Sequence, residues 1–107
     1  MDHCIDGTVL ISRRRAKRQF RQSILEAWNH ACAYCEKPAT TLDHVRPRSK
    51  GGETSRNNLI SCCANCNCRK GSYEWVYWYR TQPFWTAERE ATIWIWLHQN
   101  DETEEVC

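Results

Sequence analysis

The sequence predicts a small α+β domain in which a metal ion holds two short strands and a central helix. A basic helix precedes this unit and an aromatic-rich helix follows it. Eight cysteines occur in 107 residues, and two Cys-x-x-Cys pairs stand out among them. Two β-branched, apolar stretches lie between the pairs, and segments with helical periodicity lie outside them. A chain of this length is expected to form one domain, residues 1–107, and so small a domain often needs a staple.

The N-terminal third is expected to hold the basic helix. Residues 1–11 form a loose start or a short strand over 8–11 in this prediction, and the helix begins at Ser12, which can cap it, and ends near His30. An apolar stripe recurs every three to four residues, and the other faces are basic. The stripe consists of Phe20, Ile24, Trp28 and Ala31, and the basic block of Arg13, Arg14, Arg15, Lys17, Arg18 and Arg21. Such a block is typical of a nucleic-acid-binding surface, although a solvated helix face or a disordered arm would look the same.

Two short strands are expected between the cysteine pairs, over residues 40–45 and 59–61, because both stretches are apolar and β-branched. A polar loop that contains glycine, residues 48–53, separates them. A helix should then begin within residues 64–67 and run through Trp75 to Trp78, before Gln82 and Pro83 break it.

The C-terminal segment predicts a last helix, which Thr86 can cap and which has Glu88 and Glu90 in its first turn, where the helix dipole favours acids. One face of this helix carries Ala91, Trp94, Ile95 and His98. The aromatic residues of this third either build the core of the domain, which we favour, or stack on unpaired bases. They are Trp75, Trp78, Trp85, Trp94, Trp96, Tyr73, Tyr77, Tyr79 and Phe84.

The two Cys-x-x-Cys pairs predict a structural zinc site, because zinc prefers a tetrahedron of thiolates. The zinc would tie the end of the first helix to the start of the central helix. The predicted ligands are Cys32, Cys35, Cys63 and Cys66. Replacing the third by Cys62, or the fourth by Cys68, would break the two-residue spacing. The cysteines left over are Cys4, Cys62, Cys68 and Cys107.

The N-terminus lacks the apolar segment of a secretion signal, and no stretch approaches the ~20 apolar residues of a membrane span. We therefore expect a cytoplasmic protein of a bacterium or a phage-infected cell, whose thiols stay reduced. The alternative is a secreted protein with a disulfide framework, since eight cysteines are an even number.

Several elements around the second cysteine pair follow the order of a known motif. They read DHVRPRSKGG over residues 43–52, NNL over residues 57–59 and CANCNCRKG over residues 63–71. With the first cysteine pair, this stretch of residues 32–71 resembles the HNH endonuclease motif. The resemblance implies a ββα-metal, treble-clef-like core that hydrolyses DNA phosphodiester bonds.

The resemblance implies roles for four residues. His44 would be the general base that deprotonates a water, and Asn58 would hold the loop and orient the histidine. Asp43 and Asn67 would bind one catalytic cation. The position of Asn67 is often a histidine in this family, and an amide oxygen is a harder ligand that favours Mg²⁺ or Mn²⁺. Taken alone, an Asp-His pair is usually a surface turn, and a single asparagine is usually a turn residue or a helix cap.

The residue types support the same chemistry without the family. A histidine that is neutral near pH 7 can accept a proton from water. A bound cation offsets the negative charge that builds up during phosphodiester cleavage. Two protein oxygens suffice for Mg²⁺, which retains water and phosphate as its other ligands.

Basic residues that would contact DNA phosphates lie in the loop, on the central helix and on the first helix. They are Arg46, Arg48, Lys50, Arg56, Arg69, Lys70, Arg14 and Arg18. We therefore expect a metal-dependent endonuclease acting on double-stranded DNA, as a monomer or weak dimer, such as the homing endonucleases of phages and mobile elements. One active site per monomer makes nicking the default. The alternative is a catalytically silent zinc module that binds nucleic acid.

Overall fold

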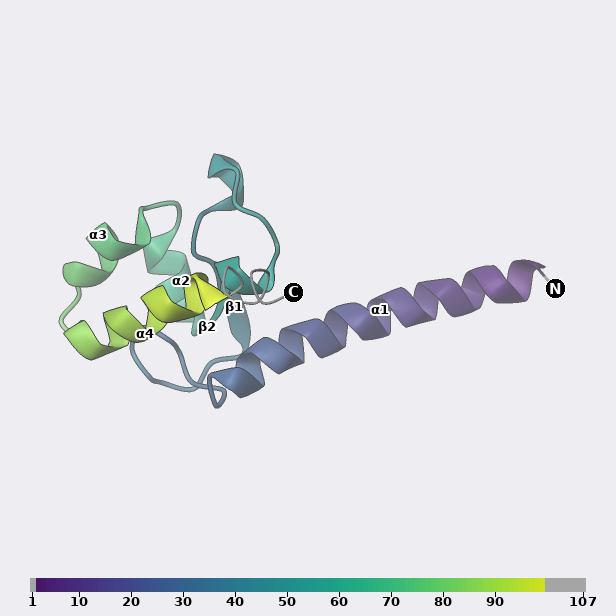
Figure 1. The fold of residues 1–107 in the computed structure, drawn as a ribbon, viewed down its shortest axis with the longest axis horizontal. Helices are drawn as coiled ribbons and strands as arrows, with labels where there is room; N and C mark the ends of the chain where they lie inside the picture. Colours follow the sequence, from purple (N-terminus) through teal and green to yellow (C-terminus); the bar gives the residue numbers. More distant parts are fainter. Residues whose placement is uncertain (1, 100–107) are drawn as a thin grey trace.

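The computed structural model describes residues 2–99, with side chains from residue 12 onward, so Cys4 and Cys107 lie outside the described side chains. Its helices are α1 (Asp2–Ala27), α2 (Ala64–Lys70), α3 (Trp75–Arg80) and α4 (Ala87–Leu97). Its strands are β1 (Thr41–His44) and β2 (Leu59–Cys62), and two short 3-10 helices are η1 (Arg48–Lys50) and η2 (Arg56–Asn58). This small α+β arrangement confirms the predicted fold class (Figure 1).

The first helix is longer at its start and shorter at its end than the sequence indicates. It begins at Asp2, so the strand expected over residues 8–11 is wrong. The described sheet consists of β1 and β2, and no third strand is present there to pair with that segment. Positive φ angles of 56° at Asn29 and His30 follow the helix, which ends at Ala27. Ala31 lies in a β-bridge with Pro38 instead of on the helical stripe.

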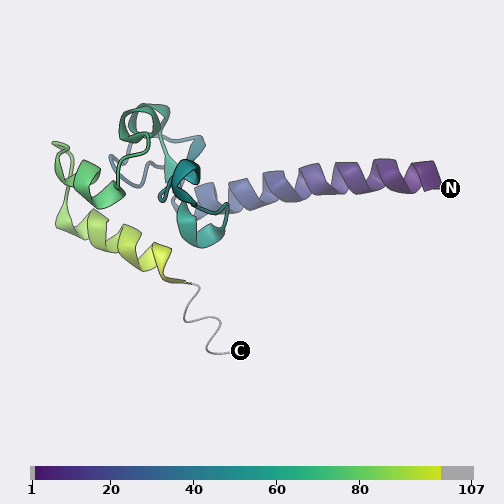
Figure 2. The ribbon, with the colours of Figure 1, turned by 90° about the horizontal axis from the view of Figure 1, so that it is seen from above.

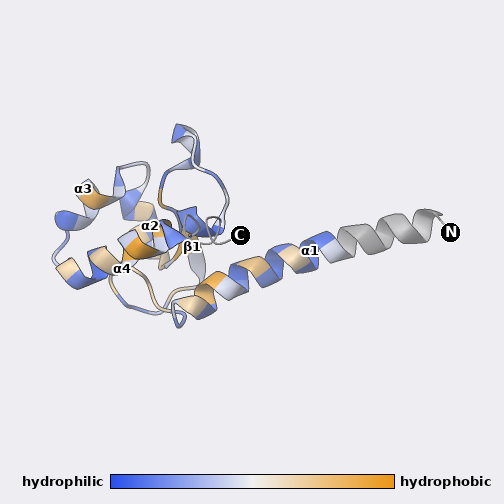
Figure 3. Ribbon diagram, in the orientation of Figure 1, coloured by the Kyte–Doolittle hydropathy of each residue, from blue (hydrophilic) through white to orange (hydrophobic). Residues whose placement is uncertain are grey.

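The C-terminal end of α1 anchors the helix to the rest of the molecule. Ile24, Leu25 and Trp28 are buried there, whereas residues 12–19 are all exposed. Two perpendicular views show α1 as a rod that extends away from the other elements (Figures 1 and 2). Hydrophobic residues gather at its inner end and hydrophilic residues along its middle (Figure 3). No helix in the described part of the chain is both long and apolar enough to cross a membrane.

The strands form an antiparallel pair in which Asp43 lies opposite Ile60 and His44 opposite Leu59. All four residues of β2 are buried, because α1 packs against both strands and α2 packs against β1. Successive side chains of a strand point to opposite faces. The side chains of Asp43 and His44, neighbours in β1, therefore project from opposite faces of the sheet.

The single helix expected from residues 64–67 to Trp78 is divided into α2 and α3. Gly71 follows α2 with φ 51° and ψ −127°, a conformation that side chains with a Cβ rarely adopt. The Glu74 carboxylate then caps α3 by accepting hydrogen bonds from the backbone amides of Val76 and Tyr77. The chain thereby turns between α2 and α3.

The last helix begins as predicted, with the Thr86 hydroxyl accepting a hydrogen bond of 3.1 Å from the Arg89 amide. Its buried face carries Ile93, with Trp96 and Leu97 half-buried. The face that carries Trp94 and Ile95 is instead exposed, because it points away from the core.

Most of the aromatic residues of the C-terminal third belong to the core, as we favoured. Tyr34 meets Trp78 with ring centroids 5.0 Å apart and Tyr79 at 5.2 Å. Trp96 meets Trp28 of the α1 end at 5.4 Å. Large exposed aromatic side chains remain at Tyr73, Tyr77, Trp85 and Trp94.

Candidate metal centre and active site

The four cysteines of the two Cys-x-x-Cys pairs converge on one point. Their sulfur atoms all lie within 4.8 Å of one another, and the Cys35 and Cys63 sulfurs are 3.7 Å apart. Thiolates at ~2.3 Å from a tetrahedral zinc lie ~3.8 Å apart, so little movement is needed to enclose an ion. Cys63 is also the N-cap of α2, where its sulfur accepts a hydrogen bond from the Cys66 amide.

The other two described cysteines lie outside this cluster. Cys68 is exposed, and Cys62 is buried with its thiol donating to the Cys63 carbonyl oxygen at 3.4 Å. The neighbouring Cys62 thiol lowers the pKa of Cys32 by a hydrogen bond, and burial opposes this effect. Burial raises the pKa of both Cys35 and Cys66. A metal ion binds cysteine as the thiolate and would displace these protons, and four sulfur donors fit a soft divalent metal.

The His44 imidazole lies at the end of β1, half-buried, with its Nε2 atom 2.9 Å from the Thr54 hydroxyl oxygen. Its pKa is lowered, first by burial and then by the positive charges of Arg48 and Lys70. Neutral imidazole is the form that accepts a proton. Sequence reasoning missed Thr54, since no local pattern marks a hydroxyl ten positions from its partner.

A pocket of about 470 Å³ opens beside His44. Its walls come from the loop, the sheet and α1, and three of its side chains besides His44 are basic. The lining residues are Lys17, Phe20, Arg21, Leu42, His44, Arg48, Thr54 and Leu59.

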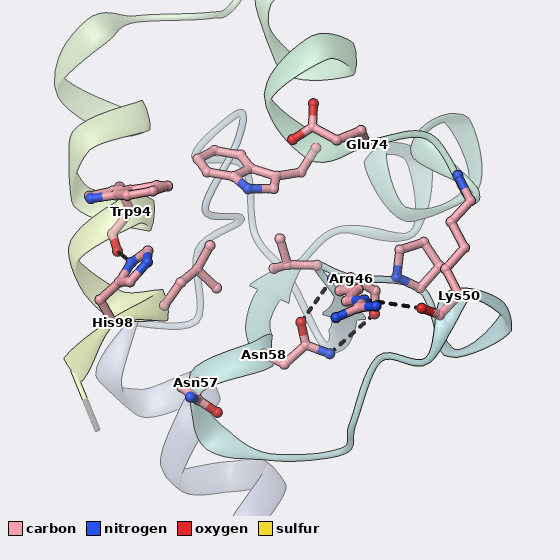
Figure 4. A pocket seen from close by; sticks show the side chains of 11 residues that line it. Arg46, Lys50, Asn57, Asn58, Glu74, Trp94 and His98 are labelled. Atoms are coloured by element: carbon pink, nitrogen blue, oxygen red, sulfur yellow. Dashed lines mark hydrogen bonds between the residues drawn. The ribbon is translucent and has the colours of Figure 1, made fainter. Parts of the chain in front are cut away.

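Asn58 pins the loop that joins the strands. Its Oδ1 atom accepts a hydrogen bond from the Arg46 amide at 2.8 Å, and its Nδ2 atom donates to the Arg46 carbonyl oxygen at 3.1 Å (Figure 4). The Nδ2 atom also donates to the Glu53 carbonyl oxygen at 2.8 Å. The loop doubles back tightly here, because a Cβ at Gly52 would lie 1.7 Å from the Arg46 carbonyl oxygen. Asn58 thus holds the loop, while the contact to His44 comes from Thr54.

A second pocket, of about 510 Å³, is lined in part by Arg46 and Asn58, and Figure 4 shows its side chains. Val45 and Trp75 help to form its apolar wall, and Trp94 and His98 of α4 face it. His44 does not line this pocket, so it is separate from the candidate active site.

Asp43 is buried in a network that the sequence did not indicate. Its Oδ2 atom lies 3.3 Å from the Lys70 ammonium and accepts a hydrogen bond of 3.0 Å from the Tyr34 hydroxyl. The ammonium also donates to the His44 carbonyl oxygen at 3.3 Å. Burial raises the pKa of Asp43, and the Lys70 charge and the Tyr34 hydroxyl act against this rise.

Lys70 requires a correction, because it was predicted to contact DNA. Its side chain is 0% exposed and is held between Asp43 and β1, so it has no surface to offer a phosphate. Asn67 lies on the same helix, and its Nδ2 atom donates to the Leu42 carbonyl oxygen at 3.1 Å. The amide of Asn67 therefore lies over β1 next to Asp43, with Oδ1 left to act as a ligand.

The remaining predicted DNA contacts differ in their surroundings. Most are exposed: Arg14, Arg18, Arg46, Arg48, Lys50 and Arg69. Arg56 is half-buried, because its guanidinium lies 4.8 Å from the Trp96 ring centroid and donates to the Ser23 hydroxyl. The α1 side chains that line the His44 pocket are Lys17 and Arg21, in place of the expected Arg14 and Arg18.

Comparison with known proteins agrees with this geometry. Residues 32–73 match the model of the HNH endonuclease family, and this range contains the cysteine cluster, His44 and α2. The chain is also 36% identical over 64 residues to a CRISPR-associated endonuclease Cas9 of Corynebacterium diphtheriae. The match covers 55% of this chain and 6% of that relative. No solved structure matches the chain. The likeness to the HNH endonuclease family thus lies in residues 32–73, and the chain spans only a small part of the relative's length.

Proposed function

We propose that this protein is a metal-dependent endonuclease that hydrolyses phosphodiester bonds of double-stranded DNA, with His44 as the general base. The observation that carries the proposal is the position of the His44 imidazole, which lines a pocket with Lys17, Arg21 and Arg48. A basic pocket attracts a phosphate, and a neutral imidazole within it can accept a proton from a water.

The ring nitrogen that we assign to this proton transfer is Nδ1, because Nε2 already contacts the Thr54 hydroxyl at 2.9 Å. The lowered pKa of His44 keeps the ring unprotonated at pH 7. Thr54 fixes the direction of the ring, and Asn58 fixes the loop from which Thr54 projects.

The residues that we propose for the catalytic cation are Asp43 and Asn67, whose oxygens suit Mg²⁺ or Mn²⁺. A cation shared with the His44 pocket requires the buried Asp43 carboxylate to turn away from Lys70 and Tyr34. When bound, such a cation would offset the negative charge on the phosphate and on the leaving oxygen. The Lys70 ammonium contacts both carboxylate oxygens of Asp43, at 3.3 and 3.5 Å. We therefore expect cation binding to weaken at least one of these two contacts.

A second, structural ion, which we infer to be zinc, would bind the four cysteine sulfurs. It would join the turn of residues 32–35 to the start of α2, which carries Asn67 and Lys70 against β1. Soft sulfur donors and hard oxygen donors would thus separate the two ions chemically.

The DNA contacts that we propose are the exposed Arg46, Arg48, Lys50 and Arg69. One active site per chain leads us to expect nicking, with double-strand cuts requiring a second copy or a second event. We propose for this small nuclease a homing-type role in a phage or another mobile element.

Relaxation of a supercoiled plasmid tests the proposal. Wild type, His44→Ala and the control His98→Ala would each be incubated with Mg²⁺, Mn²⁺ or EDTA, after equal metal content and helicity are verified. His98 is a suitable control because it is exposed and lies outside the His44 pocket. We expect cation-dependent nicking by wild type and His98→Ala, and its loss in His44→Ala.

Two results would contradict the proposal. Equal cutting by His44→Ala and wild type would remove His44 from the reaction. Absence of cutting by wild type on DNAs of varied sequence, with either cation, would favour the catalytically silent zinc module that only binds nucleic acid.

A further inference from the structure

The pocket beside His44 has a wall that lies outside the HNH-type segment. Residues 32–73 contribute Leu42, Arg48, Thr54 and Leu59 to it, and α1 contributes Lys17, Phe20 and Arg21. The family motif alone therefore describes only part of the surface that a substrate at His44 would meet.

The α1 wall is held in a defined position relative to His44. One turn after Arg21, Ile24 and Leu25 are buried against the sheet, and Phe20 packs against the same core. The Arg56 guanidinium also donates to the Ser23 hydroxyl at 3.2 Å, which links α1 to the end of the strand-joining loop. Lys17 and Arg21 are themselves exposed, so their charges remain available.

The charge of this wall indicates the chemistry of its partner. Residues 12–22 contain no acidic residue, and none of the described residues that line the pocket is acidic. The side chains of residues 12–19 are all exposed and include a single apolar residue, Ala16, so this part of α1 offers no apolar face to another protein. A cationic helix that stands free of the core suits a polyanion, which for a nuclease is the nucleic-acid backbone.

We propose that Lys17 and Arg21 bind phosphates of the strand whose scissile bond lies at His44, opposite Arg48. The strand is thereby held from two sides, by α1 and by the loop. The two α1 residues lie one helical turn apart, ~6 Å along the helix axis. They can therefore contact different phosphates of the same strand. This inference rests on the proposed nuclease function for its choice of strand, but DNA binding tests it separately.

The test compares two double variants that remove the same charge from α1. Lys17→Gln/Arg21→Gln removes the charges of the pocket wall, and the control Arg13→Gln/Arg15→Gln removes two exposed cations that do not line the pocket. Each is combined with His44→Ala to prevent cutting, and binding of the zinc-loaded protein to a labelled 30-base-pair duplex is measured without added Mg²⁺ or Mn²⁺. Fluorescence anisotropy follows binding from 0.05 to 0.5 M salt.

We expect the wall variant to reduce the slope of log binding constant against log salt by about 1.8, since each phosphate contact contributes ~0.9. Over the tenfold range from 0.5 to 0.05 M salt, a difference of 1.8 in slope changes the ratio of the wild-type binding constant to the variant binding constant by about 60-fold. The control should change the slope by less than half as much. The conservative variant Lys17→Arg/Arg21→Lys should retain the wild-type slope, because it retains both charges.

In the background with His44 intact, the wall variant should raise KM for plasmid nicking far more than it lowers kcat. Equal slope changes in the wall variant and the control would overturn the inference, because they would indicate a general effect of net charge. An unchanged slope in the wall variant would also overturn it. Failure of the nuclease proposal has a different signature, in which wild type does not cut while the two variants still differ in binding.

Discussion

The buried pair of Lys70 and Asp43 makes a quantitative prediction. Lys70→Met removes an ammonium that is 0% exposed and leaves the Asp43 carboxylate, 4% exposed, with the hydrogen bond from the Tyr34 hydroxyl. Removing one member of a buried ion pair costs ~3–5 kcal/mol, because the other charge stays buried without compensation. A domain of this size has a free energy of unfolding of only ~5–15 kcal/mol. We therefore expect a folded but strongly weakened protein.

The assay is thermal unfolding followed by circular dichroism at a fixed, saturating metal concentration. At ~4 °C per kcal/mol, Lys70→Met should lower the Tm by about 12 °C or more. Asp43→Asn/Lys70→Met should recover much of this loss, since a neutral amide is cheaper to bury than a carboxylate. The control Lys50→Met, at an exposed position, should change stability by less than ~0.5 kcal/mol.

The pH dependence of the same variant has a definite sign. Lys70 lowers the pKa of Asp43, so its removal raises that pKa further. A carboxyl with a raised folded-state pKa contributes stability below its unfolded pKa of ~3.9 and loses it as pH rises through the folded value. The deficit of Lys70→Met should therefore grow from pH 4 to pH 7. A loss under ~1 kcal/mol at pH 7, or a double variant no more stable than Lys70→Met, would refute the uncompensated-charge argument.

Three further predictions follow from the site. Cys66→Ser should abolish binding of one metal equivalent and lower the Tm, whereas Cys68→Ser, outside the cluster, should retain both; elemental analysis and circular dichroism distinguish them. Asn58→Ala loses three hydrogen bonds of 2.8, 3.1 and 2.8 Å, worth about 1.5–4.5 kcal/mol in total, and protease cleavage within the loop should rise. Because the pKa of His44 is lowered from its usual ~6.5, cleavage by wild type should fall only below pH 6.5. Arg48→Gln removes one of the positive charges that lower this pKa, so the fall should begin at higher pH. An identical pH profile would show that Arg48 does not act on the pKa of His44.

The parts of the fold that sequence reasoning predicted best rest on local signals. The Cys-x-x-Cys spacing brings four sulfurs within 4.8 Å. The β-branched stretches give both strands, and Thr86 caps α4. The strands and the cap depend on residues within a few positions of one another, where propensity decides the outcome. The metal cluster joins two such local pairs, whose Cys35 and Cys63 are 28 positions apart.

The features that sequence reasoning missed depend on distant contacts or on backbone conformation. Thr54 meets His44 only because the loop folds back at Gly52. Lys70 was predicted to be an exposed cation. It is buried because it pairs with Asp43, which lies 27 positions away in the sequence. The break between α2 and α3 lies at Gly71, which has a positive φ. The sequence does not distinguish a glycine that ends a helix in this way from one that lies within a helix and only weakens it.

The start of α1 illustrates a further limit. Ser12 has the residue type of a helix cap, but the helix continues through it to Asp2. A cap residue favours a helix start without requiring one, and the basic residues that follow are themselves good helix formers. The sequence also did not show which face of the helix is turned toward His44. Burial of Ile24 sets that orientation and places Lys17 and Arg21 at the pocket.

The most direct test of the central claim, proton transfer to His44, is chemical rescue. Single-turnover nicking of a supercoiled plasmid in Mg²⁺ would be measured for wild type, for His44→Ala, and for His44→Ala with added imidazole. The account predicts that His44→Ala is slower by ~10²–10⁴-fold, the usual contribution of a general base. Added imidazole, which the pocket of about 470 Å³ can admit, should restore part of the rate as its neutral form increases. Nicking by His44→Ala at the wild-type rate, indifferent to imidazole, would contradict the account.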